Sequence, residues 1–407
     1  MNQVVRVRCC PVDRLPASIK AIAVGRGLSI LGDQVALITL AFRAKAELGH
    51  FGLAAIALAG TLPLLLLAPW AGLLVDRVRT RPILFVTLVV QGLLCIGLAL
   101  VSGWWLLALI AALAAGTAVV NPAWGALVPI LVSDSELPAA IGLQQSLTTA
   151  AQTMGPFLGG VLVYYAGFHV PLLGDAVTFF VLVVVAMLLR VDRIPSGAGQ
   201  DRVRGETFKG VTFIWHHRGL RSIVILLSVF IAAISVVDVS DIFFIMDVLH
   251  GSALAYGVFF ACFGIGMLAA TLTARHHTVL AKGPDQLIVL CCGTMAAGIL
   301  IVGSSLTIWQ AALGAVVTGI ANGVANVQFG ILMARRTRDE VRGRVMAIVG
   351  GIFGAASIIG FGIGGVLVTL LGSRWVLLGG AAVSGLSLLL TARPVLRGGE
   401  DLLTQPT

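Results

Sequence analysis

The chain has 407 residues, of which 58% are hydrophobic and only 11% are charged, and its mean hydropathy is +1.03. Soluble domains carry about 25% charged residues, so these few polar side chains cannot cover a water-facing surface, and a soluble enzyme and a disordered chain are both excluded. The net charge of +9 therefore concerns membrane orientation rather than nucleic-acid binding, because the basic residues lie between apolar runs and not along one face.

The apolar runs predict an all-α membrane protein. Residues 1–18 contain no apolar core followed by a cleavage site, so we expect a retained N-terminal segment. A helix needs about 20 apolar residues to cross a membrane, and in lipid its backbone groups must be satisfied within the segment. We expect twelve transmembrane helices, at residues 19–42, 52–75, 82–102, 105–131, 140–166, 171–189, 222–246, 253–274, 286–304, 308–333, 343–371 and 375–392.

The distribution of Lys and Arg predicts the orientation. With the amino terminus in the cytoplasm, 23 basic residues fall on the cytoplasmic side, and only Arg43, Lys45 and Arg374 fall outside. Positively charged loops stay on the cytoplasmic side. We expect both termini in the cytoplasm, in the plasma membrane of a bacterium.

A repeat divides the chain in two. The polar stretch 190–221 separates an N-terminal six-helix bundle, residues 19–189, from a C-terminal one, residues 222–392, and a cytoplasmic tail follows at 393–407. The segment 155–167, GPFLGGVLVYYAG, aligns at an offset of 205 residues with 360–372, GFGIGGVLVTLLG, which predicts two pseudo-symmetric halves. The alternative is that Gly and Val are common in any span.

A charged loop follows the second expected span. It reads GLLVDRVRTR and contains Gly72, Asp76, Arg77 and Arg81. Asp76 offers a carboxylate that can pair with arginines or with a helix amino terminus, and so can latch one conformation. Ordinary positive-inside charge accounts for the arginines but not for Asp76. The segment resembles the G-x-x-x-D-R loop signature of the major facilitator superfamily, although Arg79 stands where the family has glycine.

The fifth span carries spaced small residues. Gly142, Gly155, Pro156, Gly159 and Gly160 end in G-P-x-x-G-G, which is similar to the antiporter signature of the same superfamily. Pro156 removes a backbone hydrogen bond and the glycines expose the backbone, so we expect a bendable helix with a groove for a partner. The alternative is a glycine packing seam without bearing on transport direction.

Charged residues inside spans are costly and are therefore functional candidates. Asp33 lies in the first span and shares a helix face with Arg26 and Ser29. We predict that Asp33 exchanges the coupling proton and that Arg26 modulates it; a purely structural Asp33 is the alternative. Asp238 and Asp241 share a face of the seventh span. They form either a second proton site or part of a solvated vestibule. We expect Asp247, beyond that span, to be only solvated.

Uncharged polar residues also occur at helical spacing, and we expect them to line a substrate cavity or to form hydrogen bonds between helices. They are Gln34, Gln91, Gln144, Thr148, Gln152, Asn322 and Asn326. With three embedded carboxylates and one guanidinium, such a cavity attracts cationic or zwitterionic lipophiles more than anions.

The first span, together with NPAWGALVP at 121–129 and RGRV at 342–345, resembles the macrolide-efflux branch of the superfamily. The resemblance implies alternating access with substrate bound at the midplane, and export of small amphipathic compounds in exchange for protons. No lysine follows a glycine, so ATP is not bound through a P-loop. We expect no metal or cofactor, no nucleic acid, lipid as surroundings and a functional monomer. The alternatives are an importer or facilitator of a small nutrient and a non-transporting sensor or embedded enzyme.

Overall fold

The computed structural model of the protein describes residues 15–133, 136–189, 218–273, 284–337 and 339–400. All regular elements in this part of the chain are helical. In chain order they are α1 (Ala17–Arg77), α2 (Thr80–Leu100), α3 (Trp105–Leu131), α4 (Leu137–Ala166), α5 (His169–Leu188), α7 (Arg218–Phe243), the π-helical turn η2 (Phe244–Val248), α8 (Ala253–Leu272), α10 (Pro284–Ser304), α11 (Ile308–Arg336), α12 (Asp339–Leu371) and α13 (Ser373–Glu400). Most of the expected N-terminal segment and central loop lies outside the described residues.

Eleven stretches of the described chain are long and apolar enough to cross a membrane. Two of them, Ala17–Gly49 and Phe51–Ala68, lie within α1, whose helical backbone is interrupted between them at Gly49, where φ is 67°. Helix α4, the expected fifth span, is not one of the eleven, because Gln144, Gln145 and Gln152 make it more polar, but its 30 residues exceed the about 20 that a span needs. It packs among the other helices as the twelfth, against α1 and α8.

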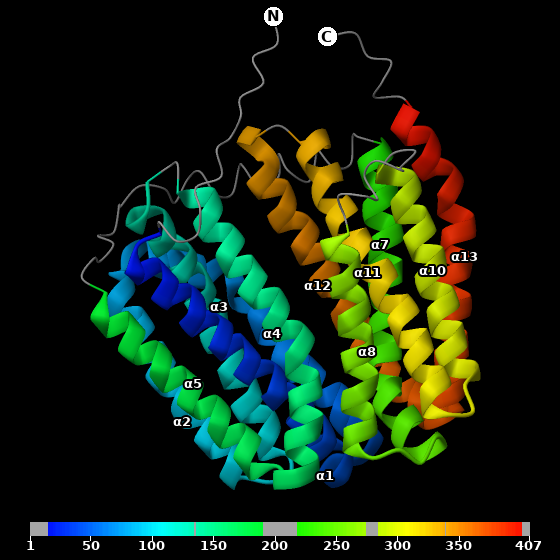
Figure 1. The fold of residues 1–407 in the computed structure, drawn as a ribbon, viewed down its shortest axis with the longest axis horizontal. Helices are drawn as coiled ribbons and strands as arrows, with labels where there is room; N and C mark the ends of the chain where they lie inside the picture. The colour runs from blue at the N-terminus through cyan, green and yellow to red at the C-terminus, as the bar shows by residue number, and fades with distance from the viewer. Residues whose placement is uncertain (1–14, 134–135, 190–217, 274–283, 338, 401–407) are drawn as a thin grey trace, which may run out of the picture.

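The helices form two bundles (Figure 1). Helices α1 to α5 pack on one another, as do α7 to α13. Contacts between the bundles run mainly through α4 with α8 and α1 with α12. The protein is thus an all-α membrane protein of two six-helix bundles.

The bundles meet toward one end of the molecule. Successive spans alternate in direction, so the turns with left-handed backbone, at Gly49, Gly103, Gly167, His250 and Gly372, gather at that end, which we call the hairpin face. The end where α1 begins and α13 ends is the terminal face. A buried apolar cluster that includes Ile38 and Phe42 of α1 and Phe244 of η2 joins the bundles toward the hairpin face. Figure 1 shows their helices diverging toward the terminal face.

The sequence repeat corresponds to equivalent helix packing. Gly155 and Gly159 of α4 lie against α1, at Gln34 and Ile38. Gly360 and Gly364, at an offset of 205 residues on α12, lie in the same way against Ser235 and Val236 of α7, among others. A side chain at Gly155, Gly159 or Gly360 would collide with the neighbouring helix, and one at Gly364 would be in tight contact with it. The shared glycines thus permit the same close helix pair in both halves.

Candidate functional site

A cavity of about 410 Å³ lies between the two bundles. The first bundle contributes an apolar wall from α1, which includes Leu37, Ile38 and Leu53, and a more polar edge from α4, where Gln152 and Pro156 face the cavity. Gln34 also lines it.

The second bundle contributes an aromatic wall. Tyr256, Phe259, Phe260 and Phe263 share a face of α8, because they stand at positions i, i+3, i+4 and i+7. The ring centroids are 4.9 Å apart for Tyr256 and Phe260 and 6.5 Å apart for Phe260 and Phe263. These rings form a continuous surface suited to a flat or aliphatic apolar body.

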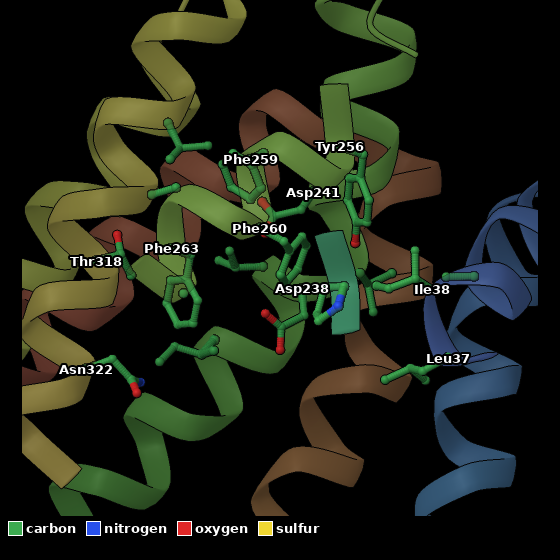
Figure 2. A pocket seen from close by; sticks show the side chains of 18 of the residues that line it. Leu37, Ile38, Asp238, Asp241, Tyr256, Phe259, Phe260, Phe263, Thr318 and Asn322 are labelled. Atoms are coloured by element: carbon green, nitrogen blue, oxygen red, sulfur yellow. The ribbon is translucent and has the colours of Figure 1, made fainter. Parts of the chain in front are cut away.

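Two carboxylates from α7 complete this wall (Figure 2). Asp238 is exposed to the cavity, whereas Asp241, one turn toward the hairpin face, is 6% exposed. In Figure 2 the Asp238 carboxylate lies between the α11 side chains Thr318 and Asn322 and the apolar residues of α1. Both of the charged side chains among the described lining residues are thus negative. In surroundings of low dielectric constant they favour a cation, and aromatic faces add to that preference.

Neutral polar groups also face the cavity. Asn322 lines it, while Asn326 lies one turn away and donates a hydrogen bond of 2.7 Å to Asn322 Oδ1. The buried Thr153 hydroxyl lines the cavity without a hydrogen-bond partner among the described residues. These groups can accept or donate hydrogen bonds to a bound molecule.

Four of the polar residues expected at a cavity do not line it: Asn326, described above, and Gln91, Gln144 and Thr148. Gln91 is 1% exposed and joins α2 to α3, donating to Leu113 O at 3.2 Å and to Thr117 Oγ1 at 3.0 Å. Gln144 and Thr148 precede Gln152 by two turns and one turn of α4, about 12 and 6 Å toward the terminal face. Gln91 thus forms hydrogen bonds between helices, which was the alternative expectation. An amide buried inside a bundle needs hydrogen-bond partners as much as an amide that faces a cavity.

Asp33 faces the interior of the first bundle instead of the cavity. It is half-buried, it does not line the cavity, and it interacts electrostatically with Asp175 of α5. Asp175 is 1% exposed and accepts hydrogen bonds of 3.3 Å from Cys95 Sγ and from Thr178 Oγ1. Gly32 leaves the room that the Asp175 carboxylate occupies against α1.

Sequence reasoning missed Asp175, although it is a carboxylate within an expected span, 171–189. The rule that selected Asp33, the cost of a charge in a membrane, selects Asp175 equally well.

Arg26 lies two turns from Asp33 toward the terminal face. Its Nη2 donates to Asn121 Oδ1 of α3 at 3.3 Å, and in the described part of the chain no ion pair joins it to Asp33. The cation expected to modulate Asp33 is therefore held by α3 in this conformation.

The expected loop latch is described in part. Arg81 donates to the carbonyl of Met187 near the end of α5, and Arg77 is exposed. Gly72 has open space where a side chain would lie. The side chain of Asp76 lies outside the described residues. Arg81 thus ties the start of α2 to α5 within one bundle.

The glycine-rich helix α4 serves both bundles. Gly142 faces open space, whereas Gly155 and Gly159 hold α4 against α1 and Pro156 lines the cavity. Gly160 meets Gly257 of α8 backbone to backbone. The motif therefore forms a close helix seam between the bundles beside the cavity.

Comparisons with known proteins agree with this architecture. The model of a family described as transmembrane secretion effector matches residues 38–406. A Bacillus subtilis (strain 168) protein, the uncharacterized MFS-type transporter YfiS, is 23% identical over 377 residues, covering 89% of this chain and 89% of that protein.

Solved structures show the same fold. The nucleoside transporter NupG matches with a TM-score of 0.74 and 12% identity, covering 93% of this chain and 99% of that one. A bacterial homologue of the human lysosomal transporter Spinster, in an inward-facing and unoccupied conformation, matches with a TM-score of 0.72 and 14% identity, covering 94% and 97%. At these identities the structural likeness concerns the fold alone.

Proposed function

The chain belongs to the transmembrane secretion effector family of the major facilitator superfamily, and on that premise we propose that it exports small amphipathic compounds, cationic or zwitterionic, in exchange for protons. It is a multi-pass membrane transporter of the major facilitator type. The observation that carries the proposal is the cavity between the bundles, where Asp238 and Asp241 stand beside four aromatic rings.

The substrate class follows from the chemistry of the cavity walls. An apolar body is accommodated between Leu37 and Ile38 on one side and the α8 rings on the other. Its positive group is placed against Asp238, the more exposed carboxylate. A purely anionic compound would meet two like charges in a poorly solvated space, which is unfavourable.

Proton exchange is assigned to the first bundle. Asp33 and Asp175 are carboxyl groups away from the cavity. Asp175 accepts hydrogen bonds from Cys95 and Thr178. The free energy of charging such a group depends on its surroundings. A shift of α1 relative to α5 during transport therefore favours proton uptake or release. Arg26, which now donates to Asn121, supplies a nearby cation when α1 moves.

Transport itself requires the cavity to open to each side in turn. We assign the terminal face to the cytoplasm of a bacterial cell, in accordance with the basic residues on that side, and the plasma membrane as the location. The seam of α4 with α8, with Gly160 on Gly257, lets the bundles rock without separating. A single chain holds the whole site, so a monomer suffices.

The test is transport by the purified protein in liposomes, with ethidium as the monovalent aromatic cation and an imposed pH gradient. We expect ethidium to move against its gradient while protons move down theirs, and an aromatic carboxylate of similar size not to move. Ethidium flux without dependence on the pH gradient would identify a facilitator. Absence of flux, with binding retained, would favour a sensor.

A further inference from the structure

An ion pair joins the two bundles at the hairpin face. Lys45, near the end of the first span of α1, places its Nζ 2.6 Å from Asp247 Oδ1 in η2, although 202 residues separate the two in sequence. The Lys45 side chain is 15% exposed and that of Asp247 is 52% exposed. Asp247 is thus not merely solvated, as the sequence led us to expect.

The segment that carries Asp247 has an unusual backbone. Residues Phe244–Val248 form a π-helical turn, which continues α7 with wider hydrogen bonding, and His250 follows with φ of 52°. The Lys45 ammonium lies 5.2 Å from the centroid of the Phe243 ring. The cation therefore meets the carboxylate of Asp247 and the aromatic face of Phe243, the last residue of α7, and both stabilise a positive charge.

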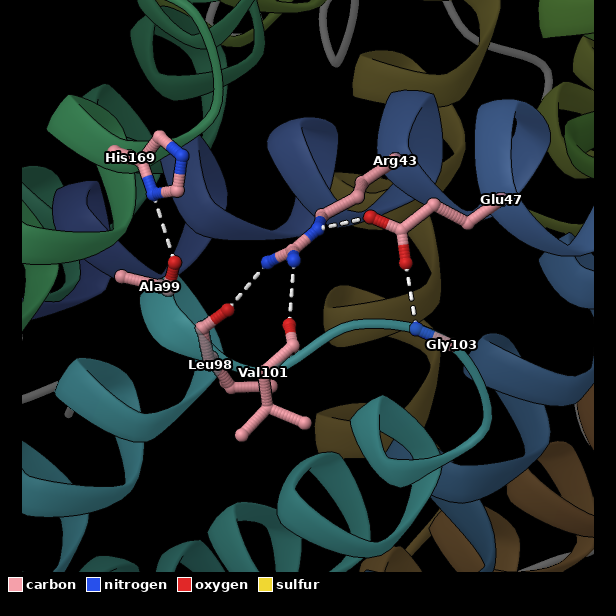
Figure 3. A network of polar contacts seen from close by, with 7 residues as sticks. All are labelled: Arg43, Glu47, Leu98, Ala99, Val101, Gly103 and His169. Atoms are coloured by element: carbon pink, nitrogen blue, oxygen red, sulfur yellow. Dashed lines mark hydrogen bonds and ion pairs between the residues drawn. The ribbon is translucent and has the colours of Figure 1, made fainter.

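Lys45 stands on a rigid support in the first bundle (Figure 3). Arg43 is 6% exposed, forms a 2.6 Å ion pair with Glu47, and donates to the carbonyls of Leu98 and Val101 at the end of α2. Glu47 accepts a 2.7 Å hydrogen bond from the backbone of Gly103. These contacts fix the hairpin-face end of the first α1 span to the α2–α3 turn, so Lys45 moves together with this end of the first bundle.

The partner segment is held in the second bundle in a similar way. Arg374, at the start of α13, donates to Ser305 O at 2.9 Å and lies over the Phe244 ring at 5.5 Å from its centroid. The three basic residues expected on the non-cytoplasmic side thus divide their roles. Arg43 and Arg374 each stabilise one bundle, whereas Lys45 crosses between the two.

We propose that Lys45 and Asp247, with Phe243, form a bolt that holds the hairpin face closed and that parts each time the cavity opens toward that face. The inference rests on the alternating opening included in the proposed function. Since both residues are held by these contacts at the hairpin face, rocking the bundles apart there separates Lys45 from Asp247 directly.

The test is access of an impermeant maleimide to a cysteine placed in the cavity by Thr318→Cys, applied from the hairpin side of the protein in membranes. Lys45→Gln and Asp247→Asn should each raise the labelling rate about two- to fivefold, the range expected for a partly exposed ion pair. The swap of Lys45→Asp with Asp247→Lys should bring the rate back toward that of the parent. Protein without the added cysteine gives the background from native thiols.

A matched control is Arg336→Gln, which removes a 2.7 Å ion pair with Asp285 that lies within the second bundle. It should leave labelling from the hairpin side unchanged. Labelling from the terminal side and elution as a monodisperse species establish that each variant is folded. Unchanged labelling in both single variants, or an equal rise with Arg336→Gln, would overturn the bolt. Because labelling requires neither substrate nor protons, either result leaves the ethidium experiment to decide the transport proposal.

Discussion

The two bundles place their carboxylates differently. In the second bundle, Asp238 and Asp241 line the cavity beside aromatic rings, whereas in the first bundle Asp33 and Asp175 lie between α1 and α5, away from it. The halves share a sequence repeat and equivalent α1–α4 and α7–α12 packing, so the difference arises from individual side chains on a common frame. It suggests a division of work, in which the second bundle recognises substrate and the first exchanges protons.

Replacing the half-buried carboxylate of the first bundle should have the largest effect. Asp33→Asn removes a group that can release a proton, so we expect gradient-driven ethidium export to be abolished while binding and counterflow persist. The measurement is flux in liposomes with and without a pH gradient. Unchanged proton coupling in this variant would remove Asp33 from the mechanism.

The matching change in the second bundle should act on binding. Asp238→Asn removes the exposed cavity charge, and we expect ethidium affinity to fall about tenfold, as for loss of a charged contact. Direct titration by fluorescence in detergent measures it. If the affinity is unchanged while coupling is lost, the roles of the bundles are reversed.

The terminal-face loop should affect turnover more than affinity. Asp76→Asn removes the proposed latch carboxylate, and we expect a several-fold lower maximal rate with a smaller change in the substrate concentration at half-maximal rate. Initial rates over a range of ethidium concentrations measure both. The opposite pattern would count against a latch at Asp76.

The smallest effect should come from the polar residue inside the first bundle. Gln91→Leu removes two hydrogen bonds between α2 and α3, so we expect the free energy of unfolding to fall by about 1 kcal/mol. Thermal unfolding in detergent measures the change. A marked loss of ethidium affinity would instead assign Gln91 to the binding site.

The sequence was sufficient for the fold because lipid imposes a strong constraint on span length and hydropathy. Helix α4 was among the twelve expected apolar stretches, although it is more polar than the eleven other spans. The two expected spans 19–42 and 52–75 are likewise separate, because the backbone between them is not helical at Gly49, where φ is 67°.

The site was harder to predict, because polar residues in a span need partners whether they face a cavity or another helix. Asn322 and Gln91 look alike in sequence, yet Asn322 lines the cavity and Gln91 bonds α3. The facing of each helix depends on packing against distant segments. The same holds for Lys45 and Asp247, whose pairing depends on the relation between the bundles.

The most direct test of the division of work compares ethidium binding to the wild type, Asp33→Asn and Asp238→Asn proteins under one set of conditions. The account predicts that Asp33→Asn binds ethidium as tightly as the wild type and that Asp238→Asn binds it about tenfold more weakly. Weakened binding in Asp33→Asn with wild-type binding in Asp238→Asn would contradict it.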